Sequence, residues 1–211
     1  MSILNNIVNE LDIALRTLSD KKTGTDREYP PAPKEKNTEE LSKKEKDLSI
    51  QMMRINHAGE VAAQALYRGQ AFVCKDPKIK EHLIHAGEEE TDHLVWCKKR
   101  LDELGGKKSI LDPLYYAGSF TLGSIAALIS DATSLGFVEE TEKQVVEHLK
   151  RHLKEMSPKD EKSRKILEKM LEEEEIHGQE AKDHGSEELP PPVKGMMTAT
   201  SKIMTTLSRY F

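Results

Sequence analysis

Two copies of a Glu-x-x-His motif, Glu90 to His93 and Glu174 to His177, restrict the possible folds of this chain more than any other feature. On an α-helix, residues three apart share a face, so each motif places a carboxylate and an imidazole one turn apart. Because a buried charge without a partner is costly, two such motifs in apolar surroundings indicate a shared two-metal site. The positions 7 and 4 residues before each Glu and 7 residues after it lie on the same helical face. For Glu90 they are Leu83, Ala86 and Cys97, and for Glu174 they are Leu167, Met170 and Ala181.

A two-metal helix bundle of this kind uses one further Glu from each of two other helices. Residues 139–142 offer three glutamates, and helical spacing separates them. The helical neighbours of Glu142 are apolar, whereas those of Glu140 are Thr, Gly, Lys and Glu, and Glu139 is intermediate. The sequence therefore predicts Glu142 as a ligand. Its apolar neighbours are Leu135, Val138, Val145 and Leu149.

Glu60 is the only acidic residue between Asp47 and Asp76. It precedes Glu90 by 30 residues, and Glu142 precedes Glu174 by 32, so each half of the chain has a lone Glu followed by Glu-x-x-His. This repeat predicts two helical hairpins that meet around one centre. The helical neighbours of Glu60 are uncharged but less apolar than those of the other three glutamates. They are Met53, His57, Gln64 and Tyr67. The predicted ligands are Glu60, Glu90, His93, Glu142, Glu174 and His177.

Four carboxylates and two imidazoles neutralise two divalent cations, which suits a protein interior. Oxygen and nitrogen ligands without thiolate favour iron or manganese over zinc. The other charged residues near the motifs have simpler interpretations. We expect exposed helix charges at Glu88, Glu89, Glu172, Glu173 and Glu175, and surface or ligand-supporting roles for His85, His148, His152 and His184. Asp92 either orients a ligand imidazole or is exposed, and Cys97 is a small core residue.

Charge and cysteine content exclude several classes of protein. The net charge is −5 and no basic stripe is apparent, which argues against a nucleic-acid binder. Cys74 and Cys97 are the only cysteines, so no disulfide framework is predicted and a reducing cytoplasm fits. Residues 1–20 carry acids early and lack a secretion-signal pattern.

The hydrophobic periodicity predicts helices only. An amphipathic helix is expected at 3–18, followed by a flexible linker containing Pro30–Pro33, so that 1–45 precede a single domain at 46–211. Four long helical patterns at about 46–74, 78–104, 124–156 and 159–183 predict an all-α four-helix bundle. Residues 114–130 carry no charge. They favour a membrane-surface or hydrophobic-ligand segment first, ordinary buried core second and a spanning helix least, and 195–211 resemble a second interfacial helix.

A series of short motifs resembles the demethoxyubiquinone hydroxylase family, bacterial branch, over about residues 45–211. The first three are Asn56-His57-Ala58-Gly59-Glu60, Gln64-Ala65-Leu66-Tyr67-x-Gly69-Gln70 and Glu89-Glu90-x-Asp92-His93-Leu94. The others are Asp112-Pro113-Leu114-x-Tyr116, Ser134-Leu135-Gly136-Phe137-Val138 and Thr141-Glu142-x-Gln144-Val145.

The resemblance implies a ferritin-like antiparallel bundle with a di-iron centre on the six ligands named above. It implies an aerobic monooxygenase that hydroxylates the ring of a polyprenyl methoxy-benzoquinol, with O₂ as co-substrate and reducing equivalents from NAD(P)H. It also implies peripheral attachment to the cytoplasmic face of a bacterial inner membrane. Proteins of ubiquinone biosynthesis and further copies of this chain are the candidate protein partners. Eukaryotic members have His-His-Tyr where this chain has Glu147-His148-Leu149, so the role of that Tyr does not carry over.

Two other functions fit the same pattern of ligands. A ferritin-like protein that oxidises or stores iron is the main alternative, but it has no use for the uncharged segment 114–130. A helical scaffold of a lipid pathway with a structural metal is the third. Metal stoichiometry and the effect of replacing Glu142 separate the three.

Overall fold

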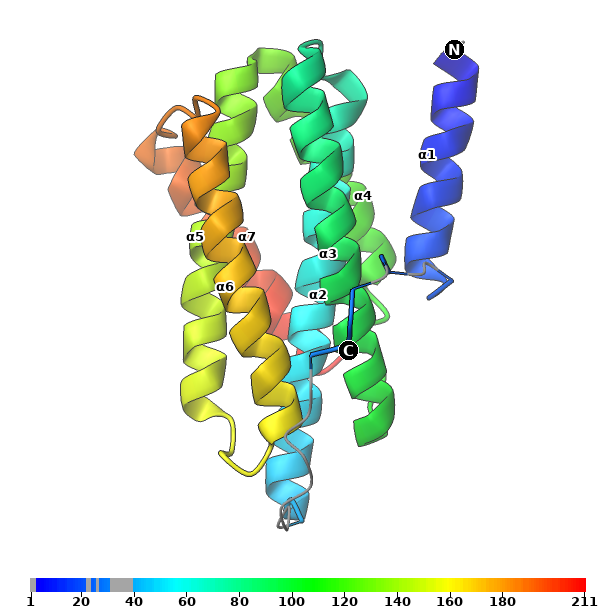
Figure 1. Ribbon diagram of the computed structural model, residues 1–211, viewed down its shortest axis with the longest axis vertical. Helices are drawn as coiled ribbons and strands as arrows, with labels where there is room; N and C mark the ends of the chain where they lie inside the picture. The colour runs from blue at the N-terminus through cyan, green and yellow to red at the C-terminus, as the bar shows by residue number, and fades with distance from the viewer. Residues whose placement is uncertain (1–2, 22–23, 26, 31–39) are drawn as a thin grey trace.

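The structure is a computed structural model that describes residues 3–21, 24–25, 27–30 and 40–211. Within these residues it contains seven α-helices and no strand (Figure 1). The expected all-α fold is therefore confirmed. The helices are α1 (Ile3–Leu18), α2 (Lys43–Val73), α3 (Pro77–Leu104), α4 (Asp112–Ile129), α5 (Asp131–Glu155), α6 (Glu161–Asp183) and α7 (Pro191–Ser208).

Helices α2, α3, α5 and α6 form the four-helix bundle along the long axis of the molecule (Figure 1). Local sequence sets their ends. Ser42 and Glu45 form a capping box at the start of α2, and Asp76 caps α3 before Pro77. Helix α3 stops at Gly105, whose φ of 74° suits glycine.

Two apolar clusters, one at each end of the bundle, show that neighbouring helices are antiparallel. In α3 the residue Leu83, before Glu90, lies in one cluster, and Cys97, after it, lies in the other. In α6 the order is reversed, because Met170 precedes Glu174 in the cluster of Cys97 and Ala181 follows in the cluster of Leu83. The acidic positions therefore meet at the middle of the bundle, between two apolar layers.

Helix α4 carries the chain across from the first hairpin to the second and packs closely along α2. Gly69 and Gly123 allow this approach: a Cβ at Gly123 would collide with the carbonyl oxygen of Leu66, and one at Gly69 with that of Phe120. A single long crossover of this kind is typical of ferritin-like bundles.

One helix boundary differs from the prediction. The third bundle helix was expected from about residue 124, but it begins at Asp131, and residues 124–129 end α4. Ser130 separates the two helices: its backbone is extended, and its side chain accepts a hydrogen bond from the Thr133 amide. The apolar periodicity runs through this break, so it could not reveal it.

The N-terminal prediction is confirmed in part. A helix occupies Ile3–Leu18 as expected, but α2 starts at Lys43, within the predicted linker. Pro31–Pro33 lie outside the described residues. Among the helices that the structure describes, none is both long enough and apolar enough to cross a bilayer.

Candidate metal centre

The middle of the bundle holds a buried cluster of carboxylates and imidazoles. Glu60 from α2, Glu90 and His93 from α3 and Glu174 from α6 each offer a ligand atom, and these four atoms lie within 4.8 Å of one another. All four side chains are buried. This group of side chains could hold a metal ion.

The two remaining predicted residues, Glu142 and His177, border this group. His177 Nδ1 lies 3.0 Å from Glu90 Oε1 and 3.4 Å from Glu174 Oε2. Glu142 from α5 lies close enough to Glu174 and Glu90 for their charges to raise its pKa, and its Oε1 accepts a 2.7 Å hydrogen bond from the hydroxyl of Tyr67. The structure therefore brings all six predicted positions together.

Both imidazoles turn the same nitrogen toward the centre. His93 Nδ1 lies 3.1 Å from Glu90 and 3.2 Å from Glu174, and His177 Nδ1 is similarly placed. The outer nitrogens face carboxylates of the opposite helix: His93 Nε2 lies 2.7 Å from Glu173, and His177 Nε2 lies 2.8 Å from Glu89. A carboxylate on the outer nitrogen fixes the ring orientation of a histidine ligand.

The prediction that Glu89 and Glu173 are exposed helix charges was wrong. Each directly precedes the Glu of one motif, so each lies beside the buried stripe, and its partner belongs to the other helix. Helical periodicity within one helix cannot show such a partner. The signal that could have found them is the repeated Glu-Glu-x-x-His, because both copies of the motif carry the extra Glu.

Other predictions near the centre had mixed outcomes. Asp92 neither orients an imidazole nor is exposed: it is buried and accepts two 2.6 Å hydrogen bonds from Thr25. Cys97 is fully buried in the core, as expected. His152 is buried rather than at the surface, while His85 is exposed.

Burial and mutual repulsion divide the four inner carboxyls into two pairs. Burial, together with the charges of Glu90 and Glu174, raises the pKa of Glu60 and Glu142 well above the usual range. Burial opposes ionisation of Glu90 and Glu174 as well, but the neighbouring imidazoles outweigh it and lower the pKa of both.

The pKa values of the two imidazoles are raised. Burial disfavours their charged forms, but the surrounding carboxylates outweigh it, raising the pKa of His93 well above its usual value and that of His177 to about 12. With Glu60 and Glu142 protonated, the two imidazolium groups balance the carboxylates of Glu90 and Glu174, and the cluster is neutral.

This donor set fits two divalent cations. Four carboxylates and two neutral imidazoles balance two such ions, so metal would replace four protons without adding net charge. Several inner atoms also lack a hydrogen-bond partner. They are Glu60 Oε2, Glu90 Oε1, Glu142 Oε2, Glu174 Oε2 and His177 Nδ1. His177 Nδ1 and Glu90 Oε1 lie 3.0 Å apart but without the geometry of a hydrogen bond. Buried polar atoms without partners are costly, so their grouping at one point favours a bound cation.

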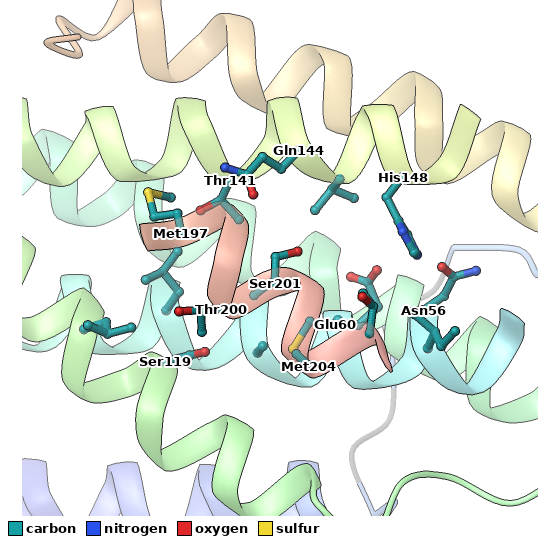
Figure 2. A pocket seen from close by; sticks show the side chains of 18 of the residues that line it. Asn56, Glu60, Ser119, Thr141, Gln144, His148, Met197, Thr200, Ser201 and Met204 are labelled. Atoms are coloured by element: carbon teal, nitrogen blue, oxygen red, sulfur yellow. The ribbon is translucent and has the colours of Figure 1, made fainter. Parts of the chain in front are cut away.

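A cavity of about 170 Å³ reaches this centre from one side. Its walls come from α2, α4, α5 and α7, and Glu60 belongs to its lining. Figure 2 shows Glu60, Asn56 and His148 at one end, and Met197 and Thr141 toward the other. The apolar lining residues are Ile55, Ala62, Ala63, Leu66, Leu122, Phe137, Val145, Leu149, Met196, Met197 and Met204.

The end of the cavity near Glu60 carries polar atoms without partners. Both amide atoms of Asn56 and the Nε2 of His148 are buried and make no hydrogen bond. Burial, followed by the charge of Arg151, lowers the pKa of His148 to about 4, so its imidazole is neutral near pH 7. Sequence reasoning did not single out Asn56, because one polar residue beside a motif has no periodic signal.

Comparisons with known proteins agree with this arrangement. The family model for ubiquinone biosynthesis protein COQ7 matches residues 47–208. A 3-demethoxyubiquinol 3-hydroxylase of Legionella pneumophila (strain Lens) is 47% identical over 209 residues, covering 99% of this chain and 98% of the relative.

Relatives with the same name occur in other bacteria. That of Francisella philomiragia subsp. philomiragia is 46% identical over 213 residues, covering 100% of this chain and 99% of the relative. That of Bordetella petrii is 46% identical over 202 residues, covering 96% and 89%. With a family model matched over most of its length and relatives aligned almost end to end, this chain belongs to the ubiquinone biosynthesis protein COQ7 family.

Proposed function

We propose that this chain is a monooxygenase that hydroxylates the ring of a polyprenyl methoxy-benzoquinol, the demethoxyubiquinol type of substrate, in ubiquinone biosynthesis. Its relatives carry the name 3-demethoxyubiquinol 3-hydroxylase. The observation that supports this function most directly is the apolar cavity whose lining includes Glu60 of the metal centre. A hydrophobic substrate in this cavity would place its head group beside the centre.

The proposed ligands are the six residues of the predicted set: Glu60, Glu90, His93, Glu142, Glu174 and His177. Two iron ions bound there would supply the activation of O₂, with reducing equivalents from NAD(P)H. The role of the protein residues is to hold the ions and to fix the orientation of the ligand side chains. Glu173 and Glu89 fix the rings of His93 and His177, and Tyr67 donates its hydroxyl hydrogen to Glu142 Oε1.

The cavity separates the two parts of such a substrate. Its apolar walls favour the isoprenoid tail, because each buried methylene contributes about 0.8 kcal/mol. Asn56 and His148 offer unpaired polar atoms at the end nearest Glu60, where the ring oxygens would lie (Figure 2). The ring is thereby oriented by hydrogen bonds, and the apolar walls exclude water from the reacting carbon.

Exposed apolar side chains support attachment to a membrane surface. On α4 and α7, two of the helices that form the cavity, Leu128, Ile129 and Ile203 each expose more than 60% of their surface. The apolar face of α1 is exposed as well. We place this surface on the cytoplasmic face of a bacterial inner membrane, with residues 46–211 as the catalytic domain. Sedimentation with anionic lipid vesicles tests it, and charged substitutions at Leu128 and Ile129 are expected to release the protein.

The decisive test of the function compares two glutamates of α5. Glu142→Ala removes a proposed ligand, whereas Glu147→Ala changes an exposed residue one and a half turns further on. In a strain lacking the natural gene, E142A is expected to accumulate the quinone precursor without the ring hydroxyl, measured by mass spectrometry of lipid extracts. E147A is expected to restore the normal quinone. Equal quinone profiles for the two variants would contradict the proposal.

Iron stoichiometry separates this proposal from an iron-storage protein, the alternative for which the comparisons give no support. We expect two iron ions per chain in purified protein loaded with Fe(II) under anaerobic conditions. Loading far beyond two per chain would indicate storage instead.

A further inference from the structure

A short N-terminal segment, formed by Gly24, Thr25 and residues 27–30, lies against the bundle on the side away from the cavity. It contacts α3 and α6, whereas the described cavity lining contains no residue of those two helices. Both the amide and the hydroxyl of Thr25 donate to Asp92, and a Cβ at Gly24 would collide with the same carboxylate. Tyr29 packs on the core and lies under Lys99 of α3, 4.0 Å from its ammonium.

Arg27 is the central residue of this segment. Its guanidinium forms an ion pair with Glu173 of α6 and lies 3.4 Å from Asp92 and 3.7 Å from Glu89, both of α3. It also lies over the Trp96 ring, 5.1 Å from the centroid. Its Nη2 donates a hydrogen bond to Glu173, whereas Nη1 lies at ion-pair distance from Asp92 and Glu89 without a hydrogen bond to either. A planar guanidinium holds its nitrogens in fixed directions, so its charge can lie between carboxylates of two helices.

The carboxylates that Arg27 joins are those that hold the ligand imidazoles. Glu173 directs Oε1 to Arg27 and Oε2 to His93 Nε2. Glu89 directs Oε1 to Arg27 and Oε2 to His177 Nε2. One guanidinium therefore lies across both carboxylate–imidazole pairs.

Glu89, Asp92 and Glu173 all lie beside Arg27. These three carboxylates would repel one another if no cation lay between them. Lys169 also contacts Glu173, at 3.1 Å, but its contacts are with Glu173 and Glu172 on its own helix. Among the described residues, the ion pairs that reach both Glu89 and Glu173 come from Arg27. Removing Arg27 would leave Glu89 and Asp92 without this cation. The carboxylates of Glu89 and Glu173 would then be free to turn away from the imidazoles.

We propose that Arg27 is a positioning residue of the metal centre, which acts through Glu89 and Glu173 on both histidine ligands. The N-terminal segment thereby helps to position the ligands of the metal site and is more than a linker before the bundle. This inference rests on the two-metal centre of the proposed function.

The test measures how firmly the protein holds Fe(II). Full-length protein is loaded anaerobically, and the rate of iron transfer to a chromogenic Fe(II) chelator is followed. Loss of a carboxylate that supports a metal ligand costs about 10–100-fold in affinity, so R27Q is expected to release iron about tenfold faster than the unaltered chain. R27K keeps the charge but cannot join the two carboxylates, and an intermediate rate is expected.

Two controls isolate the proposed role. K169Q removes one positive charge from the same Glu173, and its release rate is expected to stay within about twofold of the unaltered chain. In an E89Q/E173Q background, R27Q is expected to add little, because its route to the histidines is already removed. Thermal unfolding of the metal-free variants reports any loss of fold separately.

The outcomes also separate this inference from the proposed function. If R27Q releases iron no faster than K169Q, or accelerates release equally in the E89Q/E173Q background, Arg27 does not position the ligands. If the unaltered chain itself fails to hold two iron ions, the two-metal centre is wrong and this inference falls with it. Should R27Q fail to fold, the comparison of R27K with K169Q gives the same decision.

Discussion

The two sides of the metal centre differ in how their outer side chains are paired. On the side of α3 and α6, Glu89, Asp92 and Glu173 all have partners, and Arg27 covers them. On the side of α2, α5 and α7, an apolar cavity meets Glu60 and Asn56, whose polar atoms include some without partners. One side pairs the carboxylates that lie behind the two proposed histidine ligands, and the other leaves room for a hydrophobic molecule.

This difference has a physical cause. A ligand imidazole keeps its orientation only if its outer nitrogen is bound, so the side behind the histidines requires paired polar groups. A substrate must displace whatever occupies its site, so the side in front benefits from apolar walls and few internal hydrogen bonds. Substitutions on the two sides should therefore affect different measured quantities.

The largest expected effect comes from filling the cavity. Ala62→Phe adds a ring to the cavity wall on α2, so the substrate would be displaced from the centre. We expect turnover to fall about 100-fold, the size that a displacement of about 1 Å can cause, while two iron ions per chain are retained. The control, Ala199→Phe, adds the same ring at an exposed position of α7 outside the cavity lining. Loss of iron in A62F would break the contrast between the two sides.

The next effect concerns the helix pair that forms one wall of the cavity. Gly123→Ala would push α4 away from the backbone of α2 at Leu66, and we expect it to lower the free energy of unfolding by about 1–3 kcal/mol. Gly118→Ala, on the same helix, has open space at the Cβ and is expected to be neutral or to stabilise the helix by up to about 1 kcal/mol. Urea unfolding of the metal-free proteins measures both. Equal stabilities would show that α4 is not tightly packed.

A pH effect of intermediate size is expected from His152, a buried residue of α5 that lies one turn after His148 of the cavity lining. Burial, and then the charges of His148, Arg151 and Arg209, lower its pKa to about 2. An unfolded chain takes up a proton at this imidazole below about pH 6.5, whereas the folded chain does not. Its contribution to stability is therefore complete above pH 6.5 and declines as the pH falls.

Between pH 7 and pH 5 this residue should cost the folded state about 2 kcal/mol. His152→Gln cannot titrate, so the loss of unfolding free energy over that interval is expected to be smaller by that amount. Urea unfolding at the two pH values, without metal, compares the variant with the unaltered chain. The same pH slope in both would contradict the assignment of a neutral, buried His152.

The smallest effect is expected at the polar end of the cavity. Asn56→Leu removes two buried polar atoms that have no partner in the protein, so unfolding free energy is expected to stay level or rise by about 1 kcal/mol. If Asn56 binds a ring oxygen, KM rises up to about tenfold, the value of one hydrogen bond. A variant that is less stable and has an unchanged KM would show that Asn56 serves the fold instead.

The burial of the proposed ligands was predictable because helical periodicity acts within one helix. The spacing of apolar residues around Glu90, Glu142 and Glu174 placed each on a buried stripe, and the structure buries all three. The helix break at Ser130 was not predictable in this way, because apolar periodicity continues through it. The roles of Glu89 and Glu173 were missed because their partners lie on another helix.

By itself, the sequence determined that the chain forms a helical bundle and which six side chains meet at its centre. Repeated motifs on apolar stripes leave few alternatives, since a buried carboxylate requires a partner. Only the tertiary structure decided which nitrogen of each imidazole faces inward, that Arg27 lies behind both histidines, and that a cavity opens at Glu60. Each of these depends on contacts between segments far apart in the chain, and such contacts leave no regular spacing in the sequence.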